Sequence, residues 1–359
     1  MSSKKVAIIG LGLIGGSFVK AVKHADQGIF ISAFDKPEVL KKALQEKVID
    51  ETLTNIEDSL NYDLIILALP IEQSLNIFRL LAPMLKSNQI ISDLCSVKGI
   101  FADEWITFSS KGTYIGAHPM TGKEKSGYDN SDALLFENSI FIVCPDNNKS
   151  DILNNYNDII RLTGARIVLL NPYLHDRIAS QVSHLPQLLS VLLVNQVTDK
   201  SGKTSLLDFA AGGFRDMTRI ASSDFEIWEP IISNNKKNIL ESLNFFENQI
   251  VQLKKMIENN NFKAINNLFE SARITRNEIP ANTKGFIDPL YDITVFVKDE
   301  PGMISKISTI LFENKINIKD IELLKIREGT GGNFKFYFES ETDAAKAKQL
   351  IVNAGFNIQ

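Results

Sequence analysis

His118 is the residue of this chain best placed to move a proton. It follows an apolar stretch, residues 113–117, that is typical of a buried strand, and it precedes a proline and a glycine-rich loop. The chain has only four histidines, and a neutral imidazole is the side chain best suited to proton transfer near pH 7. A histidine at a strand end can also stabilise a turn, so other residues must decide between these roles.

A hydroxyl and an ammonium follow another strand pattern, at residues 89–93. Ser96 and Lys98 lie two residues apart in the loop after it. Ser96 could orient a substrate hydroxyl or a nicotinamide amide, and Lys98 could pair with a substrate carboxylate. The alternative is a helix N-cap and a solvated lysine. Loops that leave parallel strands meet at one sheet edge, so we expect these side chains and His118 in one cleft.

The N-terminal glycines form a nucleotide-binding pattern between an apolar strand and a segment with helical apolar spacing. Gly10 allows a tight turn, Gly12 lets the backbone approach a pyrophosphate, and Gly15 lets helix and strand pack closely. Leu13 and Ile14 begin the helix whose N-terminus faces the phosphates. The pattern predicts a dinucleotide cofactor.

A carboxylate follows the second predicted strand. Asp35 lies 20 residues after Gly15, where a Rossmann-type domain places the acid that binds the adenosine ribose hydroxyls. It would repel a 2'-phosphate, so NAD is favoured over NADP, although Lys36 weakens that preference. Leu69 and Pro70 end a further buried strand pattern, and we expect them to line the cofactor cleft.

The composition argues against several classes of protein. A net charge of -4, without a basic face interleaved with aromatic residues, gives no reason to expect nucleic acid. No apolar run approaches the roughly 18 residues of a membrane span, and the N-terminus lacks the pattern of a signal peptide. Cys95 and Cys144 indicate buried thiols in a cytoplasmic protein, and no Cys or His spacing predicts a metal.

Helical periodicity replaces strand patterns from Tyr173 to about Arg276. The apolar stripes are wide enough for a helix bundle, plausibly one shared between two subunits. Pro186 interrupts one stripe beside His184, and a proline frees a carbonyl and bends the helix axis. Polar groups could therefore face the cleft here, although a satisfied buried histidine is slightly favoured for His184.

Two arginines, Arg215 and Arg219, lie one helical turn apart after a pair of glycines. Arginine supplies a planar, permanently charged fork that matches a carboxylate, so this pair could bind a substrate carboxylate. The alternative is a pair of surface arginines bridged to Asp216 and Asp224.

Three loops, in their order and spacing, resemble the prephenate dehydrogenase family. The matching motifs are Gly10-x-Gly12-x-x-Gly15, Asp93-x-x-Ser96-x-Lys98 and Gly116-x-His118-Pro119-Met120-x-Gly122-x-Glu124-x-x-Gly127. These enzymes, with the arogenate dehydrogenases, carry out the NAD(P)-dependent oxidative decarboxylation step of tyrosine biosynthesis. The resemblance implies an α/β Rossmann-type parallel-sheet domain over 1–171 and an all-α helical dimerisation domain over 172–284.

The resemblance also implies roles for single residues. His118 matches the catalytic histidine that accepts the proton of the ring 4-hydroxyl, and Ser96 matches a serine that hydrogen-bonds that hydroxyl and the histidine. Glu124 matches an acid that helps to order the pocket entrance. Arg219 matches an arginine that binds substrate carboxylate, and Trp228 matches a tryptophan that approaches the site from the partner subunit, unless it is a core aromatic.

Two positions depart from the family pattern. The segment of Ser183 and His184 resembles the family's Ser-His-Leu-Pro, but the substrate-contacting histidine that follows there is Gln187 in this chain. Gln187 can still donate a hydrogen bond, but it carries no charge. We expect Ser183, His184 and Gln187 to lie on the substrate side of the cleft. Lys123 stands where the family often has a small polar residue.

Residues 285–359 resemble an ACT domain, a small α+β module that commonly binds amino acids. Strand and helix patterns follow the order βαββαβ, and an Asp-x-Pro-Gly turn leads into the first helix. The resemblance implies feedback control with tyrosine as the effector, contacted by Gly302, Asn317 and Ile318.

The sequence thus predicts a cytoplasmic homodimer that oxidises prephenate with NAD. Arogenate, whose side chain is amino rather than keto, is the nearest alternative substrate, and Lys123 and Gln187 lie where that choice would be made. A β-hydroxyacid dehydrogenase with Lys98 as acid/base would leave His118 idle. A non-catalytic protein that binds NAD and an amino acid is a third possibility.

Overall fold

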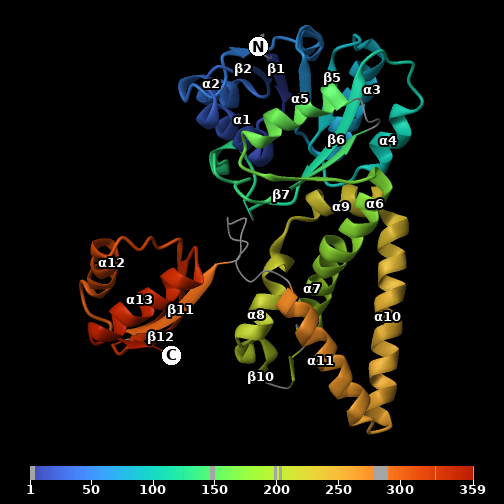
Figure 1. Ribbon diagram of the computed structural model, residues 1–359. Coiled ribbons are helices and arrows are strands. Elements are labelled where there is room, and N and C mark those ends of the chain that lie inside the picture. The colour runs from blue at the N-terminus through green and yellow to red at the C-terminus, as the bar shows by residue number, and fades with distance from the viewer. Residues whose placement is uncertain are drawn as a thin grey trace. The chain divides into compact units, whose positions relative to one another are not determined.

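The computed structural model describes residues 5–123, 125–145, 150–197, 200–201, 204–278, 290–327 and 329–358 (Figure 1). The chain divides into two compact units, Met1–Asn267 and Leu268–Gln359. Among the described residues, no helix has the length and apolar character needed to cross a membrane. The predicted domain boundaries at 171/172 and 284/285 stay predictions.

The first unit begins with a sheet domain. Its elements are β1 (Lys5–Ile9), α1 (Leu13–Ala25), β2 (Phe30–Phe34), α2 (Pro37–Gln45), β3 (Glu51–Thr52), η1 (Ile56–Asn61), β4 (Leu64–Leu67), α3 (Ile71–Leu81), η2 (Ala82–Met84), β5 (Ile90–Asp93), α4 (Gly99–Trp105), β6 (Thr113–Pro119), η3 (Tyr128–Asn130), β7 (Ile140–Pro145), α5 (Ser150–Arg161) and β8 (Arg166–Leu169).

The eight strands lie in the order β3-β2-β1-β4-β5-β6-β7-β8. From β3 to β6 all neighbours are parallel, as predicted, so the loops after β1, β4, β5 and β6 leave from one edge. The sequence analysis did not predict that β7 runs antiparallel to β6 and that β8 follows the direction of β7. An antiparallel neighbour needs no crossover helix, and the link between β6 and β7 contains only the short η3.

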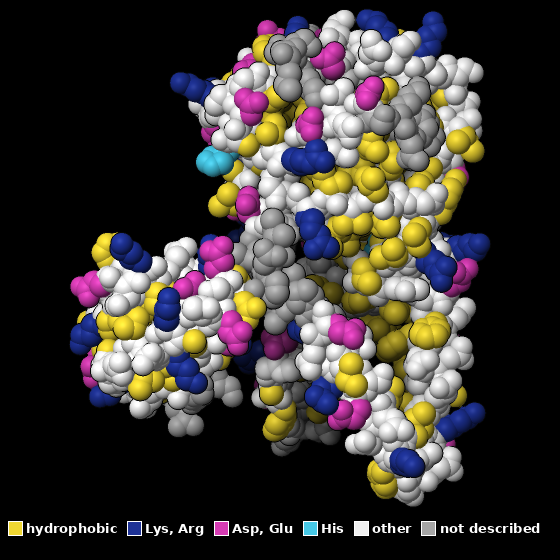
Figure 2. All heavy atoms as spheres, in the orientation of Figure 1, with side chains coloured by type: hydrophobic (Ala, Val, Ile, Leu, Met, Phe, Trp, Pro, Cys, Tyr) yellow, Lys and Arg dark blue, Asp and Glu magenta, His cyan; other side chains and the backbone are white. Residues whose placement is uncertain are grey.

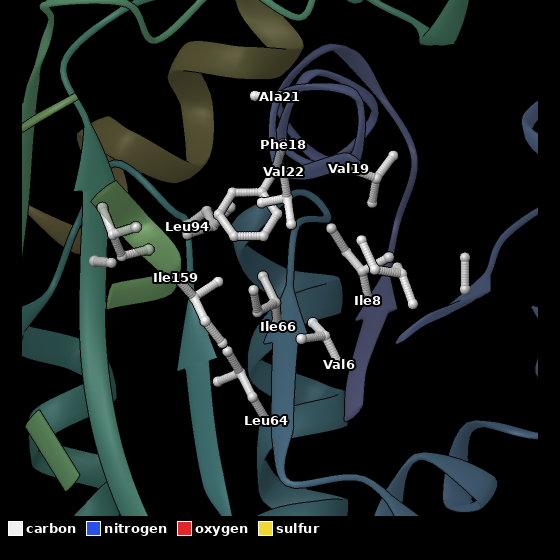
Figure 3. Close-up of a cluster of buried hydrophobic side chains, with 14 of the residues drawn as sticks. Val6, Ile8, Phe18, Val19, Ala21, Val22, Leu64, Ile66, Leu94 and Ile159 are labelled. Carbon is white, nitrogen blue, oxygen red and sulfur yellow. The ribbon is translucent and has the colours of Figure 1, made fainter. Parts of the chain in front are cut away.

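Both faces of the sheet are buried, which explains the continuous apolar strand runs. Ile8 and Ile66 pack with residues of α1 and α5 on one face, whereas Ile9 and Leu67 pack with residues of α3 and α4 on the other. Figure 3 shows Phe18 of α1 lying over the strands of the first face. Burial of this kind stabilises the fold by roughly 1.5–3 kcal/mol for each large apolar side chain.

The glycine loop between β1 and α1 is set by close backbone contacts. Gly10 has a φ of +101°, and a Cβ there would lie 2.6 Å from the Ala68 carbonyl oxygen. A Cβ on Gly15 would lie 2.0 Å from the Gly10 carbonyl oxygen. A Cβ on Gly12, in contrast, would meet no described atom within 4 Å. Gly10 and Gly15 are thus required by packing, and Gly12 faces open space.

A helical segment follows in the first unit. Its elements are α6 (Pro172–Ala179), η4 (Ser180–His184), α7 (Leu185–Gln196), β9 (Lys200–Ser201), β10 (Thr204–Ser205), η5 (Leu206–Phe209), α8 (Gly212–Thr218), η6 (Arg219–Ser222), α9 (Phe225–Asn234), α10 (Lys236–Glu258) and α11 (Phe262–Glu278), within which the two units divide. The strands β9 and β10 pair as a short ladder that the helical prediction did not include.

Apolar side chains stay exposed on the helical segment. Leu192 of α7 and Phe245 of α10 are 59% and 68% exposed, and Figure 2 shows hydrophobic side chains gathered along these helices. Apolar side chains gathered in this way on the surface of a single chain are typical of a protein–protein interface.

The second unit contains a four-stranded antiparallel sheet, ordered β12-β13-β11-β14. Its elements are β11 (Tyr291–Val297), α12 (Met303–Glu313), β12 (Asp320–Arg327), β13 (Gly331–Phe338), α13 (Glu341–Asn353) and β14 (Asn357–Ile358). The βαββαβ prediction is confirmed. The second strand of this unit, β12, begins at Asp320, and Ile316 and Ile318 pack on the core just before it, outside the ladder.

Gly15→Ala should destabilise the protein, because the new Cβ forces α1 away from the glycine loop; we expect a loss of about 1–3 kcal/mol in the free energy of unfolding. Gly12→Ala is the matched control, because its Cβ would meet no described atom, and it should cost no more than about 1 kcal/mol, since alanine is a poorer N-cap than glycine. Denaturant unfolding of both variants measures the difference. Equal stabilities would contradict the close packing at Gly15.

Candidate active site

His118 is held by a strand ladder rather than by a loop. The strand β6 continues through Pro119, and His118 pairs with Ile142 of β7. Ala117 is fully buried, while the next residue, His118, is partly exposed. The antiparallel β7 therefore fixes the backbone of His118 at the edge where the parallel strands end.

A second histidine, which the sequence analysis missed, backs the ring of His118. His175 Nε2 lies 2.8 Å from His118 Nδ1, and His175 Nδ1 lies 2.8 Å from Asp176 Oδ1. His175 is fully buried and comes from α6. A histidine directly followed by an acid in a chain with four histidines was the available signal, but nothing in the local sequence pairs it with His118.

Asp176 joins α6 to the beginning of α4. Its carboxylate accepts hydrogen bonds from the backbone N–H groups of Lys98, at 2.7 Å, and Gly99, at 2.8 Å. A Cβ on Gly99 would lie 2.8 Å from Asp176 Oδ2, so glycine leaves room for this contact. The carboxylate satisfies two backbone donors that begin a helix and would otherwise lack acceptors.

Lys98 has a structural role, which corrects the prediction that it pairs with a substrate carboxylate. Its side chain is fully buried, its ammonium forms an ion pair with Asp93, and it donates to the Ala117 carbonyl oxygen at 2.7 Å. The Tyr114 hydroxyl donates to the other Asp93 oxygen at 2.8 Å. The buried ammonium thus holds the ends of β5 and β6 together beside His118, and an acid/base role for Lys98 has no support.

The surroundings keep His118 uncharged. Desolvation of the ring holds the pKa of His118 well below 6.5, and His175, the Lys98 ammonium and His184 lower it further. An imidazole with this pKa is neutral at pH 7 and can accept a proton.

His184 lies in a π-helical turn, η4, that ends two residues before Pro186. Burial lowers its pKa to about 4. The Asn235 amide lies 3.2 Å from His184 Nδ1 and also donates to the Asp176 carbonyl oxygen at 2.8 Å. Trp228 packs edge-on to the His184 ring at 5.9 Å within the same chain; an approach of this tryptophan from a partner stays a prediction.

The other predicted substrate residues lie around the helix α7. Gln187 is buried and its amide donates to the Ile220 carbonyl oxygen at 2.9 Å, so it anchors η6, the turn that begins with Arg219. Arg219 is exposed, and Ser183 is half-buried beside His184. Glu124 lies outside the described residues.

One of the predicted cofactor residues, Asp35, contacts the glycine loop directly. Asp35 Oδ2 accepts from the Leu11 backbone N–H at 2.5 Å, which places the carboxylate against the loop. Leu13 and Ile14 begin α1 and are partly exposed, as is Leu69. Pro70 is exposed and is the N-cap of α3. Ser96 is partly exposed in the loop after β5. Cys95 and Cys144 are buried free thiols, as predicted.

Three family models match the chain in succession. They are the nucleotide-binding domain of prephenate dehydrogenase over residues 18–169, its dimerization domain over 171–271, and the ACT domain over 291–355. The prephenate dehydrogenase of Bacillus subtilis (strain 168) is 33% identical over 358 residues, which cover 96% of this chain and 95% of the relative. The chain belongs to the prephenate dehydrogenase family.

Further members extend the likeness. The prephenate dehydrogenase of Lactococcus lactis is 31% identical over 98% of both chains. A structure of Aquifex aeolicus prephenate dehydrogenase with hydroxyphenyl propionate and NAD+ has a TM-score of 0.70 and 29% identity, and covers 78% of this chain and 99% of that one. A structure of Synechocystis arogenate dehydrogenase has a TM-score of 0.69 and 25% identity, and it covers 76% of this chain and 99% of that one. The predicted family and fold class are confirmed, and this family member is an oxidoreductase.

Lys98→Met keeps the side-chain stem and removes the ammonium, which leaves the Asp93 carboxylate buried with only Tyr114 as a described donor from a side chain. Loss of one partner of a buried pair typically costs about 3–5 kcal/mol in the free energy of unfolding. Lys42→Met, which breaks the exposed pair with Asp129, should cost less than about 1 kcal/mol. Similar losses in denaturant unfolding would show that the Lys98 ammonium is not structural.

Proposed function

We propose that this protein catalyses the oxidative decarboxylation of prephenate to 4-hydroxyphenylpyruvate with reduction of NAD. The observation that carries the proposal is the position of the partly exposed residue His118 at the sheet edge, where the buried His175 backs its ring. Burial there holds the pKa of the imidazole well below 6.5. Relatives that cover nearly the whole chain are prephenate dehydrogenases, which supports the same substrate here.

The glycine loop fits a dinucleotide. Gly12 faces open space while Gly10 and Gly15 are held by close packing, so the backbone can approach a pyrophosphate at the N-terminus of α1. Asp35 lies against the same loop and can bind ribose hydroxyls. When bound, NAD supplies an acceptor for the hydride of the substrate's C4.

His118 supplies the proton acceptor. Its Nδ1 faces His175, so Nε2 is the nitrogen that takes the proton of the 4-hydroxyl as the hydride leaves C4. The bond between C1 and the ring carboxylate then breaks, carbon dioxide leaves, and its electron pair makes the ring aromatic. The proton returns from His118 to the phenolate oxygen, so the overall reaction releases none. A positioned base contributes about 100-fold or more to the rate.

Ser96 and Arg219 orient the substrate in this proposal. Ser96, partly exposed after β5, hydrogen-bonds the 4-hydroxyl, and Arg219 at the beginning of η6 binds a carboxylate. Gln187 anchors η6 through the Ile220 carbonyl, and so sets the position of Arg219. Orientation of this kind can contribute several kcal/mol to catalysis.

His118→Asn should lower kcat at least about 100-fold while NAD binding persists, because only the proton acceptor is lost. In the unaltered enzyme, activity needs neutral His118, so kcat/KM should fall only as pH drops through a pKa well below 6.5. Absorbance of NADH with prephenate measures both. Wild-type turnover by the His118→Asn variant would contradict the assignment of the base, and so would a loss of kcat/KM on the acid side at pH 6.5 or higher in the unaltered enzyme. The control is His24→Asn, on the exposed end of α1, which should keep the wild-type activity.

A homodimer is the assembly we propose. The match to the family's dimerization domain and the exposed apolar residues of α7 and α10 support it, because such surfaces are normally covered.

The ACT domain is proposed to bind a feedback effector, tyrosine. A cavity of about 370 Å³ lies at the beginning of α12. The described residues that line it include Gly302, with a φ of +84°, and Ser305, but neither Asn317 nor Ile318. Asn317 is exposed and Ile318 packs on the domain core, so Gly302 is the predicted effector contact that the cavity supports.

Tyrosine should inhibit turnover of prephenate, and Ser305→Phe should weaken that inhibition at least about 10-fold, because the phenyl ring fills the cavity. Thr309→Phe, one turn further along α12, is the matched control and should leave the inhibition by tyrosine unchanged. Assays of NADH formation with prephenate and arogenate side by side, each with and without tyrosine, test substrate and effector together. If neither tyrosine nor phenylalanine changed the rate of NADH formation, feedback control by these amino acids would be ruled out.

A further inference from the structure

Three of the four histidines gather at the candidate active site, yet the proposed reaction uses only His118. His175 is fully buried and Asp176 is 4% exposed. They form a continuous chain of hydrogen bonds behind the base, from His118 Nδ1 to His175 Nε2 and from His175 Nδ1 to Asp176 Oδ1, each 2.8 Å long. A buried polar chain of this kind has a cost unless each of its donors meets an acceptor.

The contacts of Asp176 determine where each proton lies. A carboxylate only accepts hydrogen bonds, and that of Asp176 already receives the N–H groups of Lys98 and Gly99. His175 must therefore donate from Nδ1. A neutral His175 then accepts at Nε2, so the proton of neutral His118 lies on Nδ1.

We propose that His175 and Asp176 are positioning residues that hold the proton of His118 on Nδ1 and leave the lone pair of Nε2 for the substrate hydroxyl. The proposal rests on the proposed function, because it takes His118 as the base. It extends that function by assigning the groups that place the proton of neutral His118 on Nδ1 and so leave Nε2 as the acceptor.

The same chain supports the charge that forms during the reaction. When Nε2 of His118 takes a proton, the imidazolium keeps its Nδ1–H bond to His175, which in turn donates to the negative Asp176. A base oriented by a third group follows the logic of the catalytic triads. Asp176 cannot swing away, because two backbone N–H groups hold its carboxylate and the Asn235 amide holds its carbonyl oxygen.

The ring nitrogens can be observed directly by NMR of the full-length protein labelled with 15N-histidine. With four histidines, single substitutions assign each ring. At neutral pH and without substrate, we expect the His118 signals to show a protonated Nδ1 and an unprotonated Nε2. A proton on Nε2 of His118 in the wild-type protein would overturn the proposal, whatever the substrate proves to be.

Kinetics of two variants separate positioning from a merely structural role. His175→Leu removes the acceptor for His118 Nδ1, and we expect kcat to fall about 100-fold, with KM and the Kd of NAD changed less than about threefold. His175→Gln should recover most of that loss, because its amide oxygen can accept the same hydrogen bond. His24→Leu, at the exposed end of α1, is the control and should behave as wild type.

The outcomes are distinguishable. Wild-type kcat in His175→Leu would overturn the proposal, and so would equal losses in the Leu and Gln variants. If the Leu variant does not fold, the NMR experiment on the wild-type protein still decides the position of the proton. Absence of prephenate turnover by the wild-type enzyme would defeat the proposed function alone, since the spectra need no substrate.

Discussion

The hydrogen bonds between the Asp176 carboxylate and the backbone N–H groups of Lys98 and Gly99 join the sheet domain to the helical segment. They fix α6 against the beginning of α4, and α6 brings His175 to His118. Because the carboxylate is buried, solvent water cannot take its place as the acceptor for these two backbone N–H groups. The position of the candidate base therefore depends on contacts between residues that are far apart in the sequence: Asp176 is 78 positions from Lys98 and 77 from Gly99.

The buried ion pair of Lys98 and Asp93 supports the same region from the other side. Transfer of both charges from water is expensive, and such a pair seldom adds net stability over an apolar substitute. Here the ammonium also binds the Ala117 carbonyl, and the Tyr114 hydroxyl binds Asp93. We interpret the pair as a device for placement, because it aligns the ends of β5 and β6 and adds a positive charge that disfavours protonation of His118.

The fold followed from local patterns to a large extent. The glycine loop, the buried parallel strands and the βαββαβ unit are encoded in apolar periodicity and in glycines, which act within a few residues of themselves. The antiparallel β7 was not predicted, because a buried strand has the same apolar run in either direction. The role predicted for Lys98 was wrong for a related reason: sequence places a lysine after a strand but does not show whether its ammonium meets solvent or Asp93.

The sequence by itself determined the family, the loops that meet at the sheet edge, and His118 as the histidine to examine. Spacing along the chain was sufficient, since each of these features lies on one strand and its following loop. Only the tertiary structure decided what stands behind His118. His175 is 57 residues away, and its contact with His118 depends on how α6 docks on α4, which no local pattern specifies. Burial, which lowers the pKa of His118, likewise exists only after the helical segment has packed on the sheet.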